Sequence, residues 1–103
     1  MVHTAVLEVI IEHRFPEMQI AIHPNDGLDL DLITREHGFF IFAGTSLDKF
    51  KEGKGLIGEG ELHLLNDCPH GVLQVSEKIS LRLAGSDKAM LILDNKKVLL
   101  AYK

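Results

Sequence analysis

The sequence has very little cysteine: Cys68 is the only one among 103 residues. One cysteine cannot form a disulfide within the chain, which argues against a small secreted domain stabilised by such bonds. The sequence also has no apolar run as long as a membrane-spanning helix, and its N-terminus lacks the basic segment of a signal peptide. We therefore expect a cytoplasmic protein with no membrane association.

The sequence is also poor in aromatic side chains and has no excess of basic ones. It has no tryptophan, one tyrosine and a formal net charge of −4. Nucleic-acid binding needs a basic groove, commonly with aromatic platforms for the bases, so we expect no nucleic-acid partner. Acidic residues gather in the first half of the chain, at Glu8, Glu12, Glu17, Asp26, Asp29, Asp31, Glu36 and Asp48.

Apolar and polar residues alternate with a period of two through much of the chain. Hydrophobic residues make up 46% of the sequence, which is enough for one core, and no linker divides residues 1–103 into domains. The alternation predicts a mainly β fold, a small antiparallel barrel or sandwich of about seven strands with one or two short helices. A two-layer α+β fold is the alternative. We find no internal repeat.

Eight segments show the strand pattern, and two show helical signals. Polar clusters between the strands are typical of turns. Leu28–His37 fits either a strand or a helix, with Asp26 as a candidate N-cap and Gly38 as a candidate end, and the two end signals favour the helix. Ser46–Glu52 predicts a single helical turn. The predicted strands are Thr4–Glu12, Met18–His23, Phe39–Ala43, Glu61–Leu65, Val72–Val75, Ile79–Leu83, Ala89–Leu93 and Val98–Tyr102.

The segment from Gly53 to Gly58 matches the G-x-G-x-x-G pattern of dinucleotide-binding proteins. That pattern needs a buried strand before the glycines and a helix that opens at the third one. Here another glycine and a strand pattern follow instead. We therefore expect no cofactor. We interpret Gly53–Gly60 as a glycine-rich turn or bulged strand, and a mobile lid over a pocket is a further interpretation.

The candidate site residues are His63, Cys68 and His70, which lie within eight residues of each other. Imidazole and thiolate groups are ligands for zinc or copper, but the spacing matches no zinc finger. The metal is therefore unknown, and a polar turn with a surface histidine is the simpler interpretation. Cys68 could act as a nucleophile beside a histidine, although a lone cysteine is more often a small apolar filler. We identify no catalytic residue.

The sequence favours a non-enzymatic interaction module that self-associates and docks on a protein partner. This hypothesis rests on apolar residues on both faces of Thr4–Glu12 and Phe39–Ala43, because surplus apolar surface is typical of interfaces. One alternative is a barrel that binds a small molecule or a metal, including an enzyme of that kind. A second alternative is an acidic accessory or inhibitor protein that binds a basic partner.

Overall fold

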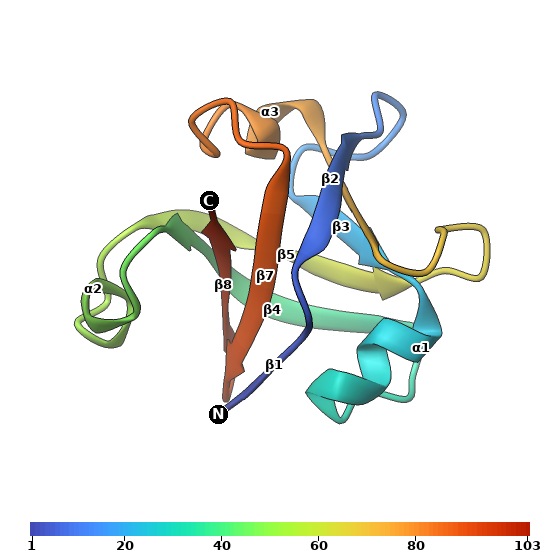
Figure 1. Cartoon of the computed structure of the whole chain (residues 1–103), viewed down its shortest axis with the longest axis horizontal. Coiled ribbons are helices and arrows are strands. Elements are labelled where there is room, and N and C mark those ends of the chain that lie inside the picture. The colour runs from blue at the N-terminus through green and yellow to red at the C-terminus, as the bar shows by residue number, and fades with distance from the viewer.

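The chain forms a closed β-barrel, seen in a computed structural model that describes all 103 residues (Figure 1). Seven strands follow the order β7-β2-β6-β3-β5-β4-β8, and β8 pairs back with β7 to close the barrel. The strands are β1 (Val2–His3), β2 (Leu7–Ile11), β3 (Gln19–Ile22), β4 (Glu36–Gly44), β5 (Leu56–Leu64), β6 (Val72–Val75), β7 (Lys88–Asp94) and β8 (Lys97–Tyr102). The helical segments are α1 (Pro24–Gly27), the 3₁₀ turn η1 (Leu28–Leu30), α2 (Leu47–Lys51) and α3 (Glu77–Ser80).

The prediction of a mainly β fold, a small barrel of about seven strands, is confirmed, and three short helices and one 3₁₀ turn are present where one or two helices were predicted. Most of the predicted strands are present, although β4 begins three residues and β5 five residues before the predicted start. The helix α2 begins after Ser46, whose hydroxyl accepts a hydrogen bond from the backbone N–H of Lys49. The ladders are not all antiparallel, because β2–β6, β3–β5 and β4–β8 are parallel pairs. None of the helices is long and apolar enough to cross a lipid bilayer.

The strand predicted at Ile79–Leu83 is wrong, because the chain forms α3 and a turn there. Ser76 caps this helix by accepting a hydrogen bond from the backbone N–H of Ile79. Ile79 and Leu83 are buried and Leu81 is exposed, so two apolar side chains cover the end of the barrel. In so short a segment, helical and strand spacing of apolar residues cannot be distinguished.

The helix predicted over Leu28–His37 is present only at its start. Helical structure begins earlier, in α1, and ends with η1, and Gly38 lies inside β4 and ends no helix. The N-cap is His23 and not Asp26, since His23 Nδ1 accepts the hydrogen bond from the backbone N–H of Asn25.

The predicted first strand, Thr4–Glu12, is interrupted after its start. β1 and β2 both pair with β7, and the chain between them leaves the ladder. Thr4 bridges the gap: its N–H donates to the carbonyl of Leu91, and its hydroxyl accepts from the N–H of Leu91 at 3.1 Å. A buried threonine side chain thus takes the place of a missing backbone acceptor.

The barrel consists of two similar halves, which the sequence did not reveal. The two halves are related by a shift of 53 positions. Val9 pairs with Leu73 in the parallel β2–β6 ladder, and the residues that correspond to them after the shift, Leu62 and Ile20, pair in the parallel β3–β5 ladder. The antiparallel β3–β6 pair maps onto itself under the same exchange. α1 and α3 are equivalent and cap opposite ends of the barrel (Figure 1). The repeat lies in the register and the apolar pattern, while most of the residues differ.

Apolar side chains fill the interior of the barrel. Eighteen buried residues from all the barrel strands and the capping segments form one continuous cluster, as expected for a closely packed core. A second cluster lies outside β4, where Phe50 of α2 covers Phe42 and Leu99. The outer face of Phe39–Ala43 is therefore covered at Phe42, whereas Phe40 on the same face is 43% exposed, so the sequence prediction that both faces are covered holds only in part.

The glycine-rich segment is a bulged strand and not a lid. β5 begins at Leu56, and its register against β4 shifts between Ile41 and Phe42. Gly60 packs so closely that an added Cβ would lie 2.1 Å from the carbonyl oxygen of Met18. Gly55 has a φ of +91°, a conformation that side chains rarely adopt. The glycines thus allow close packing within a continuous ladder.

Candidate functional site

The three residues predicted from the sequence as metal ligands do not form one donor set. Only one group of three or more potential ligands lies close together in the molecule, and of the three it includes only His63. His70 is paired instead with Asp26 of α1, with His70 Nε2 3.0 Å from Asp26 Oδ1. The buried Asp26 also accepts the backbone N–H of Gly71 at 2.8 Å. These contacts hold the β5–β6 turn against α1.

The thiol of Cys68 is buried and directed into the protein. Its Sγ lies 3.4 Å from the carbonyl oxygen of Val72, to which it donates a hydrogen bond. Burial raises the pKa of the Cys68 thiol to about 11, since the charged thiolate would lose its hydration. Because only the thiolate is a good nucleophile or metal ligand, Cys68 acts as a small packing residue.

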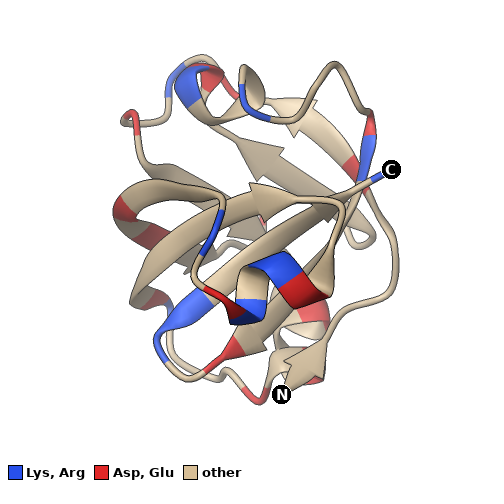
Figure 2. Cartoon of the chain, turned by 90° about the vertical axis from the view of Figure 1, so that its left-hand side faces the viewer, with Lys and Arg blue, Asp and Glu red and all other residues tan.

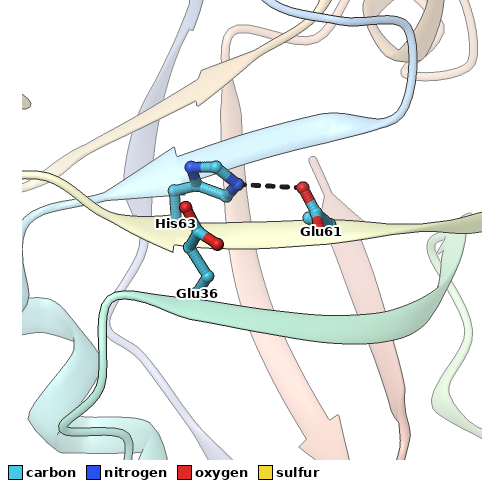
Figure 3. Close-up of side chains that lie close together, drawn as sticks. All are labelled: Glu36, Glu61 and His63. Carbon is cyan, nitrogen blue, oxygen red and sulfur yellow. Dashed lines mark hydrogen bonds and ion pairs between the residues drawn. The ribbon is translucent and has the colours of Figure 1, made fainter.

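Glu36, Glu61 and His63 bring three potential ligand atoms within 4.8 Å of one another (Figure 3). Glu36 lies opposite His63 in the antiparallel β4–β5 ladder, and Glu61 precedes His63 by two residues on the same face of β5. His63 Nε2 lies 3.1 Å from Glu61 Oε1. The His63 side chain is only 16% exposed, whereas both carboxylates are exposed. The mostly buried imidazole of His63 is therefore held in place, while the two exposed carboxylates are able to change their rotamers.

Sequence reasoning identified His63 but missed its partners. Glu61 could be read from the sequence, because residues two apart in a strand share a face. Glu36 could not, because 27 positions separate it from His63 and only the pairing register brings them together.

An open groove lies between the β2–β3 turn and α3, and we call it the α3 groove. It has a volume of about 370 Å³. Phe15 and Leu81 supply its apolar surface, and Leu81 is 79% exposed. An ion pair from Lys78 Nζ to Glu17 Oε2 at 3.2 Å and a hydrogen bond between His13 Nδ1 and Glu77 Oε2 at 3.3 Å join its walls. Its lining residues are His13, Phe15, Glu17, Ser76, Glu77, Lys78 and Leu81.

The side of the molecule that carries α2 shows charges of both signs (Figure 2). Here a polar pocket of about 200 Å³ is lined by Lys49, Lys54 and Ser46, among others. Pockets for drug-sized molecules typically hold about 300–1,000 Å³, and this one is smaller and open. This pocket holds no close group of three potential metal ligands, since the one such group lies on β4 and β5.

Searches for related proteins give no guide to function. No protein-family model matches the chain, and neither curated proteins nor solved structures give a match.

Proposed function

We propose that this chain is a small non-enzymatic interaction module that self-associates through the α3 groove. The observation that carries the proposal is the exposed Leu81 beside Phe15, with charged side chains around both. An apolar centre within a polar rim is the usual anatomy of a protein interface. The filled barrel interior supports the same function, because it leaves the outer surface as the place for binding.

The rim of the α3 groove fits a second copy of the chain. It carries both signs of charge, since Glu17, Glu77 and Lys78 all line it. In a two-fold dimer the same patch meets itself, so such a patch must be complementary to itself. A groove with both signs meets this condition, because a rotated copy can place its lysine opposite the acidic groups. A different protein with an apolar side chain between charges is the alternative occupant.

The test is the mass of the protein in solution, measured by light scattering after size-exclusion chromatography from micromolar to millimolar concentration. We expect the wild type to dimerise and Leu81→Glu to remain monomeric. Because Leu81 is 79% exposed, this change leaves the core intact. Ile33→Glu is the matched control, since Ile33 is 83% exposed and lies outside the groove. It should dimerise as the wild type does.

Two results would contradict the proposal. A wild-type monomer at millimolar concentration would exclude self-association, and equal loss of the dimer in both variants would place the interface elsewhere. Binding to a different protein that Leu81→Glu abolishes and Ile33→Glu preserves would keep the groove and replace the second copy as its occupant.

A further inference from the structure

We propose that Glu36, Glu61 and His63 form a site for one divalent transition-metal ion of the zinc class. The site lies on the outer face of β4 and β5 and is separate from the α3 groove. The two sites share no residue, so a test of metal binding is independent of a test of self-association.

The backbone that carries the three residues is held in place on both sides. β5 pairs with β4 through the register Glu36–His63 and with β3 through the register Ala21–His63. His63 is therefore anchored in the middle of three adjacent strands, and its ring is mostly covered. A site on such strands is better ordered than a site on loops, which favours binding because little freedom is lost.

The charges at the site favour a cation. Neither Glu36 nor Glu61 forms an ion pair with a lysine or arginine, and His63 is the only basic group within ion-pair distance of Glu61. No lysine or arginine therefore supplies a countercharge to these two carboxylates, whose nearest oxygen atoms lie within 4.8 Å of each other. Like charges so close repel each other, and a bound dication would relieve this repulsion.

The space around the carboxylates is open to a bound ion. Gly38 lies opposite Glu61 in the ladder, directly between Glu36 and Phe40 along the outer face of β4. A Cβ built at Gly38 would meet no atom within 4 Å, so no side chain fills this position. Zinc bonds of about 2.0–2.2 Å place neighbouring ligand atoms about 3–4 Å apart. The present separations of up to 4.8 Å can close when the exposed carboxylates rotate.

The donor set indicates the kind of metal. Calcium and magnesium prefer shells made of oxygen, while imidazole nitrogen suits zinc and other first-row transition metals. One imidazole and two carboxylates supply three protein ligands, which leaves a fourth tetrahedral position for water. We therefore expect Zn²⁺ to bind more tightly than Ca²⁺ or Mg²⁺.

The test is a calorimetric titration of the full chain with Zn²⁺, with Mg²⁺ in parallel. We expect one Zn²⁺ per chain. Loss of a partner that only orients a ligand typically weakens metal binding about 10–100-fold, so loss of a direct ligand should weaken it at least as much. This is the expected effect of Glu36→Gln, Glu61→Gln and His63→Gln. Glu59→Gln is the matched control, because Glu59 shares the strand and the outer face but lies outside the cluster.

A second readout locates the ion. Paramagnetic Co²⁺ should broaden the nuclear magnetic resonance signals of His63 and its strand neighbours first. The proposal is overturned if Zn²⁺ does not bind, if Glu59→Gln weakens binding as much as Glu61→Gln, or if broadening centres on His70. Circular dichroism of each variant establishes that it is folded before its binding is compared.

Discussion

Gly60→Ala tests the closest packing in the barrel. The added Cβ would lie 2.1 Å from the carbonyl oxygen of Met18 and 2.7 Å from Cδ1 of Ile41. Side-chain carbons do not come within 3.0 Å of such atoms, so the backbone has to move. The same Met18 carbonyl accepts a hydrogen bond from the N–H of Glu61 at 3.0 Å, and this bond weakens when the strands separate.

The expected loss of stability combines these two effects. Forcing an extra carbon into a packed core costs about 1–3 kcal/mol. A weakened backbone hydrogen bond adds about 1 kcal/mol. We therefore expect Gly60→Ala to lower the free energy of unfolding by about 3 kcal/mol, which corresponds to about 12–24 °C in melting temperature for a domain of this size.

Gly38→Ala is the matched control, because it makes the same chemical change in the neighbouring strand. A Cβ at Gly38 meets no atom within 4 Å, so this variant should be as stable as the wild type or more stable by about 0.4–1 kcal/mol. The chain has no tryptophan, so thermal and urea unfolding are followed by circular dichroism. A Gly60→Ala variant that melts within a few degrees of the wild type would refute the close β3–β5 packing.

Three further predictions concern single side chains. Thr4→Val should lower the free energy of unfolding by about 1–3 kcal/mol in urea, because the N–H of Leu91 loses its acceptor; an unchanged midpoint would contradict this. Cys68 should resist alkylation at neutral pH until the protein unfolds. With its pKa raised from 9.0 to about 11, its contribution to stability is complete below pH 9 and is lost as the pH rises towards 11. Fast alkylation of folded protein would exclude this burial. The hydrogen bond from Arg14 lowers the pKa of Glu12 from 4.5 to about 2. Any stability that this bond adds is therefore lost as the pH falls from 4.5 towards 2. In Arg14→Ala, the pKa of Glu12 measured by nuclear magnetic resonance should return to its ordinary value. A pKa unaffected by Arg14→Ala would contradict the pairing.

The choice between helix and strand was the least reliable part of the sequence reading. Ile79, Leu81 and Leu83 alternate as in a strand, yet Ser76 caps a helix there because its hydroxyl reaches the N–H of Ile79. Leu28–His37 was assigned the right kind of structure at its start and the wrong length. In both places the local pattern was compatible with two structures, and packing at the ends of the barrel decided between them.

The candidate metal site was likewise predicted only in part from the sequence. His63 was identified as a potential ligand, and the sequence also allowed Glu61 to be added, because residues two apart in a strand share a face. The grouping of His63 with Cys68 and His70 followed from proximity along the chain, whereas the turn after β5 carries Cys68 into the core and His70 to Asp26. Nearness in sequence is a poor guide where a strand ends, because the next residues turn away.

The sequence by itself determined the β class, most strands, the helical turn after Ser46 and the absence of disulfides, because these depend on composition and on patterns a few residues long. Tertiary structure decided the parallel pairings, the two similar halves and the meeting of Glu36 with His63. These features depend on which strands become neighbours and in what register. Closing the barrel around one apolar core selects that register, since a shift of one residue would turn the buried side chains outward.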